Sequence, residues 1–235
     1  MKLGILNAIH PDSSKVNWGG TPVDAYIRFL ETARPDFTYT GYNVAQGQFP
    51  AAPEENDAYI ITGSPNGAYD PDSWIARLGQ FIRDGYAGGQ KFVGICFGHQ
   101  IIAQALGGQV QKWPGGWGFG LRTFAINQPE AWMNGRPHHL SLYFAHQDQV
   151  TKLPPGAELL ASDPFCRVDM YTIDNQILGI QGHPEFTTAI MEDLFTLVKD
   201  KMEPTAYNTA VQSVQNGRPD NGLMAQWIVN FLSNR

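Results

Sequence analysis

The sequence predicts an α/β protein with three layers, in which a doubly wound, mostly parallel sheet lies between helices and carries antiparallel strands at one edge. Two observations support this prediction. Over roughly the first hundred residues, short apolar runs alternate with amphipathic stretches, as in parallel strands joined by crossover helices. From residue 109 onward, short strand-like runs are separated by Pro and Gly clusters, which indicates antiparallel connections.

The first half of the chain supplies the predicted parallel part. A helix follows the first strand, because apolar residues between 25 and 33 form one mixed helical face. Another helix is expected over 72–86, where apolar side chains recur at three- and four-residue steps and Asp72 is placed to cap the helix. A third helix is expected over 101–106. The expected strands are 3–8, 37–44, 58–62 and 91–95.

The second half supplies the predicted edge strands and a helical tail. The runs expected as antiparallel additions are 109–113, 121–126, 140–144, 159–162 and 167–173. A short apolar strand from residue 177 follows them, and the tail is expected to form helices over 189–202, 206–215 and 223–232. The 235 residues are expected to form a single domain, with a core over about 40–190 and C-terminal helices over about 187–235.

Composition narrows the classes of function. Hydrophobic residues at 43% suffice for a sizeable core, and a net charge of −6 argues against nucleic acid and anionic membrane surfaces as partners. The apolar runs are too short to span a membrane, and the first residues are interpreted as a strand and not as a signal peptide. The two cysteines, Cys96 and Cys166, are too few for a disulfide framework. We therefore expect a reduced, cytoplasmic protein.

The segment 94–100 (Gly-Ile-Cys-Phe-Gly-His-Gln) is the most informative part of the chain. An apolar run precedes it and a helical run follows, which predicts a strand, a sharp turn that carries Cys96, and a helix. The positive end of that helix favours a thiolate over a thiol. Gly94 and Gly98 allow the strand and the helix to approach closely. A lone cysteine is more often a small buried hydrophobic residue, as we expect for Cys166, but this frame favours a nucleophile.

A base for this nucleophile is predicted far downstream. The apolar strand from residue 177 ends in Gln-Gly-His-Pro-Glu, residues 181–185. Pro184 disfavours helical geometry at His183 and keeps it extended. In an extended chain, residues two apart point the same way, so His183 and Glu185 can meet. The carboxylate would then fix the tautomer of the imidazole and stabilise the imidazolium.

These two motifs together resemble the class I, triad-type glutamine amidotransferases. Gly-x-Cys-x-Gly-x-Gln and Gly-x-Gln-x-His-Pro-Glu occur in the family's order, about 90 residues apart. Other segments that resemble the family are 60–65, 106–108, 116–120 and 144–150, the last resembling its His-x-Asp-x-Val loop. The resemblance covers about residues 40–190 and implies the flavodoxin-like fold of the family. Ser64 departs from the pattern, since the family often has a second glycine there.

The resemblance implies a role for each matching residue. Cys96 would be the nucleophile, His183 the base and Glu185 the carboxylate that orients it. The oxyanion would be held by backbone N–H groups of the turn that carries Gly63 and Ser64, and of Phe97. The substrate would be glutamine or another γ-glutamyl compound, and the residues implied in binding it are Gln100, His146, Gln147 and Asp148. For His146, a plain polar contact is about as probable as substrate positioning.

The acceptor of the released ammonia stays open. The family usually delivers ammonia to a synthetase site on another domain or subunit, but the sequence ends about 50 residues after Glu185, and no synthetase module fits there. The resemblance therefore implies either a free hydrolase or a glutaminase subunit with a separate synthetase partner. A non-catalytic scaffold with the same fold is the third alternative, against which the intact Cys96, His183 and Glu185 argue.

No cofactor or metal is expected. The chain has no glycine-rich phosphate loop of the Gly-x-x-x-x-Gly-Lys type. Cys96 and His99 have the spacing of a metal-binding pair, but a structural zinc site needs a second pair, which the sequence lacks. We therefore expect His99 to lie on the helix at the rim of the site. Trp113, Trp117 and Trp132 could line a substrate cleft or simply pack in the core.

Overall fold

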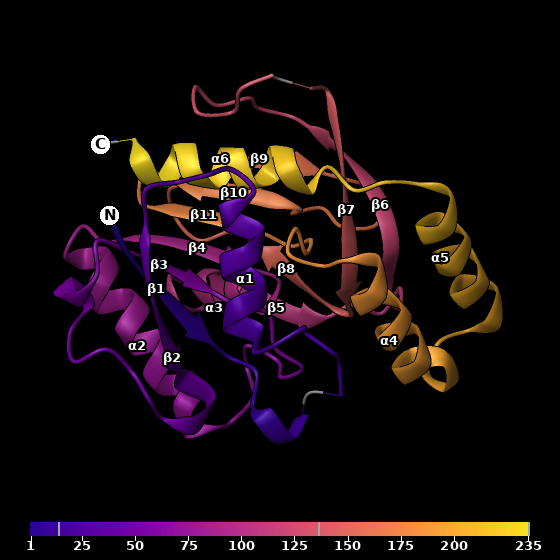
Figure 1. Cartoon of the computed structure of the whole chain (residues 1–235), viewed down its shortest axis with the longest axis horizontal. Helices are drawn as coiled ribbons and strands as arrows, with labels where there is room; N and C mark the ends of the chain where they lie inside the picture. Colours follow the sequence, from indigo (N-terminus) through magenta and orange to yellow (C-terminus); the bar gives the residue numbers. More distant parts are fainter. Residues whose placement is uncertain (14, 136, 235) are drawn as a thin grey trace.

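The computed structural model of the protein describes residues 1–13, 15–135 and 137–234, and its centre is a twisted sheet with helices on both faces (Figure 1). Across these residues the main sheet has nine strands in the order β2-β1-β3-β4-β11-β10-β9-β6-β7. The first five strands in this order run parallel, and the remaining ones join antiparallel. This arrangement confirms the predicted fold class, and the parallel half has the flavodoxin-like order.

The strands of the main sheet divide at β11. The parallel strands are β1 (Lys2–Asn7), β2 (Thr38–Asn43), β3 (Ala58–Ile61), β4 (Lys91–Ile95) and β11 (Ile177–Ile180). The antiparallel strands are β6 (Gly118–Ile126), β7 (His139–His146), β9 (Ala157–Ser162) and β10 (Met170–Ile173). All four residues of β3 and of β11 are buried, as expected for parallel strands covered on both faces.

Helices cover both faces of the parallel half. The helices on one face are α1 (Pro22–Glu31) and α6 (Asn221–Ser233), and those on the other are α2 (Ser73–Ala87) and α3 (Phe97–Ala105). The core on the first face contains Phe29, Trp227 and Phe231, and the core on the second contains Phe81 and Phe92. Full burial of one such side chain contributes roughly 1.5–3 kcal/mol, so these two cores fix the layers.

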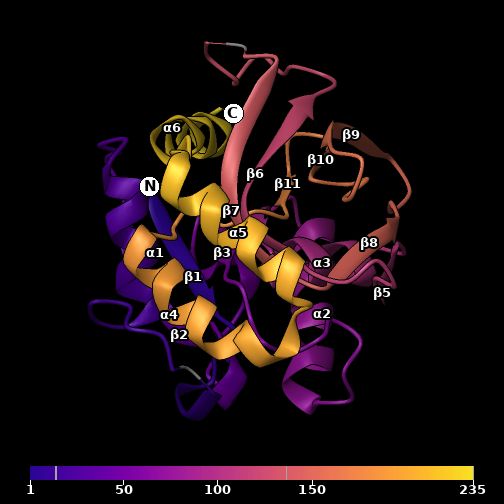
Figure 2. The same cartoon turned by 90° about the vertical axis from the view of Figure 1, so that its right-hand side faces the viewer.

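A third layer of helices covers the antiparallel half. Helix α5 (Pro204–Asn216) lies against β6, and α4 (Thr188–Val198) lies between α5 and α1 (Figure 2). Phe119 of β6 packs against Phe195 of α4, with ring centroids 5.3 Å apart. Tyr143 of β7 belongs to the same cluster. This cluster holds the antiparallel extension in place beside the segment that carries His183.

The N-terminus of α1 is closely specified by the sequence. The Thr21 hydroxyl accepts a hydrogen bond from the Asp24 N–H at 3.2 Å, and the Asp24 carboxylate accepts one from the Thr21 N–H at 2.8 Å. Pro22 stands at the first helical position, where its missing N–H costs nothing. This capping box fixes where the helix begins, and hence which residues of α1 face the sheet.

Four details differ from the sequence-based expectations. β5 (Gln109–Lys112) does not join the edge of the main sheet but pairs with β8 (Asp148–Lys152) in a separate two-stranded sheet. β8 itself lies in a segment expected as a loop. The helix expected over 189–202 ends at Val198 and continues as a 3-10 turn, Lys199–Lys201. Asp72 occupies the N-cap of α2, but its side chain makes no capping hydrogen bond.

The carboxyl ends of β3, β4 and β11 lie side by side. Ile61 pairs with Gly94, and Ile95 pairs with Ile180, so these three neighbouring strands end at nearly the same level. The turns that leave them carry Gly63, Cys96 and His183. This is the rim at which active sites of open parallel sheets form. None of the described helices combines the length and the apolar character that a membrane span requires.

Candidate active site

Cys96 lies on a strained turn between β4 and α3. Its backbone has φ 51° and ψ −102°, a conformation that few residues other than glycine adopt. A Cβ on Gly94 would lie 2.4 Å from the carbonyl carbon of Gly98, and a Cβ on Gly98 would lie 2.3 Å from the carbonyl oxygen of Ile61. Both glycines are therefore required by close backbone contacts, as the sequence predicted. The turn places Cys96 at the N-cap of α3.

His183 and Glu185 form a buried pair beside this turn. Nδ1 of His183 lies 2.8 Å from Oε1 of Glu185, and both side chains are almost fully buried. Because the carboxylate accepts, Nδ1 carries the proton and Nε2 is left for the substrate side. The His183 N–H donates to the Tyr143 carbonyl at 2.7 Å, and the ring stacks on Phe186 with centroids 3.9 Å apart. The backbone and the ring of His183 are thus both held in position.

Gly63 marks the point where the three turns meet. A Cβ added to Gly63 would lie 2.8 Å from Cε1 of His183 and 3.9 Å from Cβ of Cys96. The turn after β3 therefore passes within contact of both the thiol and the imidazole. A residue larger than glycine would displace the His183 ring.

The electrostatics of the pair favour an imidazolium. Burial by itself disfavours the charged ring, but the negative charges of Cys96 and Glu185 outweigh that cost and raise the pKa of His183. Cys96 and His183 therefore interact electrostatically, as a thiolate–imidazolium pair would require. Such a pair is the reactive form of a cysteine nucleophile.

The turn after β3 is pinned on both sides of Gly63. The Gly63 N–H donates to the Tyr26 hydroxyl at 3.0 Å, and the Gly63 carbonyl accepts from the Thr62 hydroxyl at 2.9 Å. Because a carbonyl and the next N–H belong to one planar peptide and point opposite ways, this second bond fixes the direction of the Ser64 N–H. Among the described residues, the N–H groups of Ser64 and Phe97 have no acceptor.

This geometry corrects one expectation about the oxyanion hole. The Gly63 N–H was expected as a donor, but it already has an acceptor in Tyr26. The N–H groups of Ser64 and Phe97 are free to serve instead. Whether they bind an oxyanion stays a prediction.

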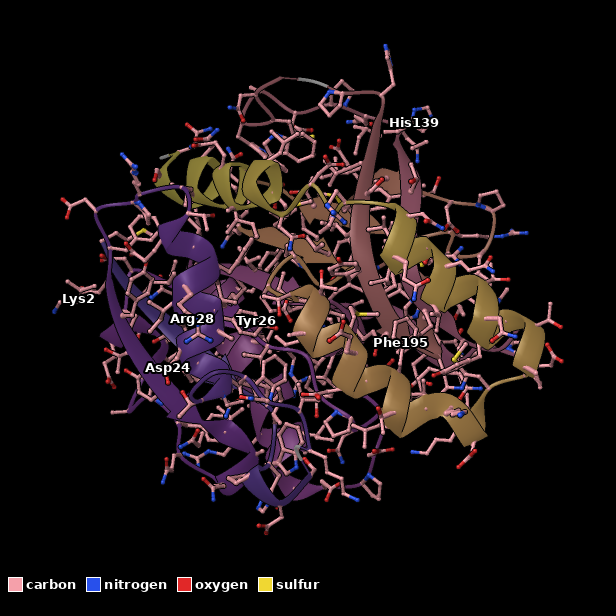
Figure 3. All side chains as sticks on the ribbon, turned by 45° about the vertical axis from the view of Figure 1, so that its right-hand side comes forward. Lys2, Asp24, Tyr26, Arg28, His139 and Phe195 are labelled. Carbon is pink, nitrogen blue, oxygen red and sulfur yellow. The ribbon has the colours of Figure 1, made fainter. Side chains whose placement is uncertain are left out.

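Tyr26 is the residue of this site that the sequence reasoning missed. It lies on the side of α1 that faces the interior (Figure 3) and is 1% exposed. Its hydroxyl donates to Oε1 of Glu185 at 2.9 Å while it accepts from Gly63. The available signal was weak: a tyrosine on the apolar face of a helix needs a partner for its hydroxyl, but the sequence does not name that partner.

Gln100 is turned away from bulk solvent, one helical turn after Cys96. Its side-chain amide donates to the Asp148 carbonyl at 2.9 Å and to Oε1 of Gln181 at 3.1 Å. Both acceptors lie on segments that neighbour α3, so Gln100 connects α3 to β8 and to the end of β11. A direct contact with substrate stays a prediction.

The residues of the turn between β7 and β8 lie at different depths. His146 is 4% exposed, and its Nδ1 lies 2.9 Å from the Asp148 carbonyl, so it makes the polar contact that was one of the two expectations, while a role in positioning substrate stays a prediction. Burial lowers the pKa of His146 to about 4, which keeps the ring neutral. The Gln147 carbonyl accepts from the Trp113 N–H, and the half-buried Asp148 carboxylate accepts from the Tyr69 hydroxyl at 3.0 Å. Gln147 and Asp148 are both half-buried, and both are more accessible to a ligand than His146.

His99 lies beneath the site and not at its rim. It is fully buried and its ring lies against Tyr171, with centroids 4.9 Å apart. Burial lowers the pKa of His99 to about 3, so the ring is neutral. No group of three or more His, Cys, Asp or Glu side chains in the described part of the chain could hold a metal ion.

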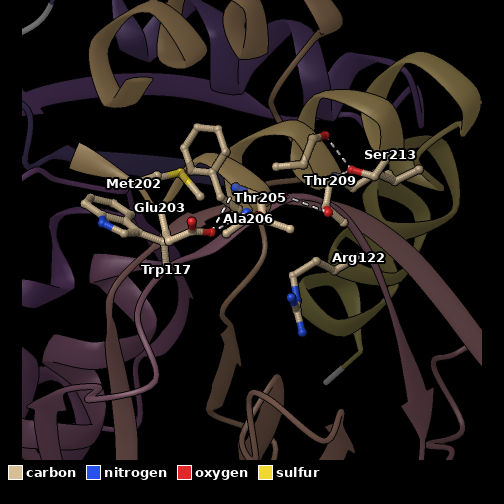
Figure 4. Close-up of a pocket in the computed structure, with 11 residues that line it drawn as sticks. Trp117, Arg122, Met202, Glu203, Thr205, Ala206, Thr209 and Ser213 are labelled. Carbon is tan, nitrogen blue, oxygen red and sulfur yellow. Dashed lines mark hydrogen bonds between the residues drawn. The ribbon is translucent and has the colours of Figure 1, made fainter. Parts of the chain in front are cut away.

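Two large hollows lie away from the thiol. One, of about 430 Å³, is bounded by α5 and β6 and lined by Trp117, Arg122 and Glu203 among others (Figure 4). The other, of about 550 Å³, lies between α1 and the start of α4 and includes Glu185 in its wall. Cys96 lines neither of them. The chemistry of the site is therefore set by the contacts among the three turns.

Comparisons with known proteins agree with this architecture. The family "Glutamine amidotransferase class-I" matches residues 22–196. "Gamma-glutamyl peptidase 3" of Arabidopsis thaliana is 33% identical over 204 residues, which cover 81% of each chain. A GMP synthase (glutamine-hydrolyzing) of Neisseria meningitidis is 35% identical over 133 residues, which cover 54% of this chain but only 24% of the synthase.

A solved structure extends the agreement to the whole fold. The structure of a glutamine amidotransferase from Thermotoga maritima superimposes with a TM-score of 0.75 at 18% identity and covers 99% of both chains. At that identity the likeness concerns the fold alone. The match of the family over residues 22–196 and the similarity to the peptidase over most of both chains identify the protein: it belongs to the class I glutamine amidotransferase family.

Proposed function

We propose that this protein is a hydrolase that cleaves the γ-glutamyl amide bond of glutamine or of another γ-glutamyl compound through a thioester on Cys96. The observation that carries the proposal is the meeting of a cysteine on a strained helix N-terminus with a buried His183–Glu185 pair. In this reading the three residues form a catalytic triad.

The first half of the reaction forms the thioester. The Cys96 thiolate attacks the side-chain amide carbon, and the carbonyl electrons move to oxygen. The N–H groups of Ser64 and Phe97 stabilise that oxyanion. When the tetrahedral intermediate collapses, the carbon–nitrogen bond breaks, and the imidazolium of His183 gives its proton to the leaving nitrogen.

The second half releases the acid. His183, now neutral, takes a proton from water, and the resulting hydroxide attacks the thioester carbonyl. The carbon–sulfur bond then breaks, which restores the thiolate and leaves a free γ-carboxylate. Glu185 holds the Nδ1–H of His183 throughout, so Nε2 faces the reacting atoms in both halves.

The similarity to a γ-glutamyl peptidase supports a free hydrolase. That relative matches 81% of its own length, so it is a protein of the same size and not a domain of a larger synthetase. We propose γ-glutamyl amides or peptides as substrates on this basis. Because both cysteines are free thiols, we also propose a reducing, cytoplasmic location, which fractionation of the source cell would test.

A second candidate function is the ammonia-donating subunit of a separate synthetase. The similarity to about a quarter of a GMP synthase favours it, because that enzyme combines a glutamine-hydrolyzing function with synthesis in one chain. A non-catalytic scaffold is the third candidate, which the intact pair of Cys96 and His183 disfavours.

The deciding experiment measures ammonia release from glutamine beside amine release from a panel of γ-glutamyl amides and peptides. No nucleotide is added. We expect turnover of at least one γ-glutamyl compound by the purified chain and none by Cys96→Ala. A chain that is inert alone but active when mixed with a synthetase from its own cell would support the subunit. A chain inert in both settings, with unreactive Cys96, would support the scaffold.

A further inference from the structure

We propose that Tyr26 is a positioning residue of this active site, whose hydroxyl couples the base to the oxyanion-binding turn. The inference rests on the proposed function, since it assigns a role in that reaction to a residue outside the three turns. It makes helix α1 part of the catalytic machinery.

The position of Tyr26 is fixed independently of the site. The capping box at Thr21 and Asp24 sets where α1 begins, and Phe29 and Leu30 of the same helix are buried in the core. Tyr26 is 1% exposed, so its ring has no freedom to swing into solvent. The hydroxyl is therefore held at a defined point between the turns that follow β3 and β11.

The hydrogen bonds of that hydroxyl can run in only one direction. The Gly63 N–H can only donate, so it donates to the Tyr26 oxygen at 3.0 Å. The hydroxyl proton is then directed to Oε1 of Glu185 at 2.9 Å. The same Oε1 accepts from Nδ1 of His183 at 2.8 Å. An unbroken chain of hydrogen bonds thus links the peptide of Gly63 to the proposed base, with Oε1 of Glu185 accepting from Tyr26 on one side and from His183 on the other.

This chain has two consequences for catalysis. First, Oε1 of Glu185 receives two donors, whereas Oε2 has none among the described residues, so Tyr26 determines which oxygen faces His183. Second, Tyr26 pins the N–H of Gly63, while Thr62 pins its carbonyl. Together they orient the free N–H of Ser64. Burial and the Glu185 charge raise the pKa of Tyr26 well above its ordinary value, so the hydroxyl stays protonated.

Tyr171 shows what an ordinary buried tyrosine does in the same molecule. It is also fully buried, and its hydroxyl donates to a backbone carbonyl, that of His99, at 2.9 Å. Among the described residues, its hydroxyl has no hydrogen bond to an ionisable side chain. The difference between the two residues is therefore the chemistry of the partner and not the depth of burial, which makes Tyr171 a matched control.

The test compares Tyr26→Phe with Tyr171→Phe. We expect Tyr26→Phe to lower kcat/KM by roughly 10- to 100-fold, mainly through kcat, because positioning of the base and of an oxyanion donor matters most in the transition state. Tyr26→Phe should also change the pH profile of kcat/KM, because Oε1 of Glu185, which holds the Nδ1–H of His183, loses one of its two donors. Tyr171→Phe should lose stability but keep the wild-type pH profile.

A readout that needs no substrate separates this inference from the proposed function. The rate of Cys96 alkylation by iodoacetamide, followed against pH, should show a changed profile in Tyr26→Phe as well. If the wild type has no activity toward any γ-glutamyl compound, the proposed function fails, but the alkylation profile still tests Tyr26. A double substitution with Glu185→Gln should lose much less than the product of the two single losses if Tyr26 acts through Glu185.

A second variant covers the case in which Tyr26→Phe does not fold. Site-specific 3-fluorotyrosine at position 26 keeps the hydroxyl and makes it a stronger donor. It should retain most of the activity and shift the pH profile of kcat/KM in the direction opposite to Tyr26→Phe. The inference would be overturned if the pH profiles of kcat/KM in both variants match that of the wild type. It would also be overturned if Tyr26→Phe and Tyr171→Phe show the same kcat/KM and the same pH profile.

Discussion

Cys96 and Cys166 are both buried near carboxyl groups but differ in their electrostatics. Around Cys96, the positive end of α3 and the imidazole of His183 favour charge. Around Cys166, burial and the nearby Asp169 raise the pKa of the thiol well above its ordinary value, and the thiol donates to the Val168 carbonyl.

The acids of the two regions differ in the same way. Glu185 receives hydrogen bonds from His183 and Tyr26, whereas burial and the charge of Asp163 raise the pKa of Asp169 to about 8. The two acids therefore differ in their partners: Glu185 accepts from two donors, whereas the oxygens of Asp169 have no hydrogen-bond partner among the described residues. An acid near a buried thiol thus does not suffice for a nucleophile, which also requires donors and a dipole directed at the thiol.

The sharpest test of this contrast removes each thiol in turn. Cys96→Ala should lower kcat/KM by roughly 10⁴-fold or more, because the covalent route is lost. Cys166→Ala should leave kcat/KM near the wild-type value and lower only the midpoint of thermal unfolding. Steady-state kinetics with unfolding curves would check both. Near-normal turnover by Cys96→Ala would remove the nucleophile assignment.

The next test concerns the base and its partner. His183→Ala should lose nearly as much activity as the cysteine variant. The fold-loss of kcat in Glu185→Gln should be roughly 10²-fold smaller than in His183→Ala, since an orienting group contributes less than the base and the effects are not additive. The measurement is kcat and KM for each variant. Equal, small losses in both would mean that another histidine is the base, although His99 and His146 are both buried and neutral.

The oxyanion-binding turn should give a smaller effect. Ser64→Pro removes the N–H that the structure leaves free, and should lower kcat by roughly 10²-fold, as expected for one oxyanion donor. Ser64→Ala keeps that N–H and serves as the control, with kcat near wild type. Single-turnover acylation rates would report the step directly. Unchanged rates in a folded Ser64→Pro protein would place the oxyanion hole elsewhere.

The smallest effect on activity, and the clearest on stability, is expected at Asp169. Its pKa is about 8 in the folded chain against an ordinary value of 3.8, so only the unfolded chain releases the proton between pH 4 and 8. The free energy of unfolding therefore falls across that window by about 1.4 kcal/mol per pH unit and levels off above it. Asp169→Asn cannot ionise, so its advantage over the wild type should grow from pH 4 to 8.

Urea unfolding at several pH values would measure this advantage. Asp163→Asn gives a second test, because it breaks the ion pair with Arg122 at 2.6 Å and also removes the charge that helps to raise the pKa of Asp169, so the free energy of unfolding should fall less steeply with pH than in the wild type. A stability difference between Asp169→Asn and the wild type that does not vary with pH would contradict the proposed environment of Asp169.

Local signals in the sequence predicted the parallel sheet and the positions of Cys96, His183 and Glu185. The glycines around Cys96 and the proline after His183 restrict the backbone by themselves, so neighbouring residue types reveal the turn and the extended segment. The comparison with known proteins confirms the family, while the roles of these three residues stay predictions until kinetics test them.

What the sequence did not predict depends on contacts between distant segments. Tyr26 and Glu185 are 159 residues apart, and helical periodicity shows that a tyrosine is buried but not what it bonds to. Residue type likewise does not show that the N–H of Gly63 is already engaged. β8 was missed because its run of alternating residues is short and pairs outside the main sheet.

The pairing of β4 with β11 separates the spacing of Cys96 and His183 from the length of the chain that joins the two strands. Ile95 and Ile180 are register partners, and the Cys96 N–H donates to the Ile180 carbonyl at 2.8 Å, so thiol and base are attached to hydrogen-bonded neighbours. The chain between these strands builds α3 and the strands from β5 to β10. That excursion can therefore change in length and sequence while the distance between the two side chains is kept unchanged.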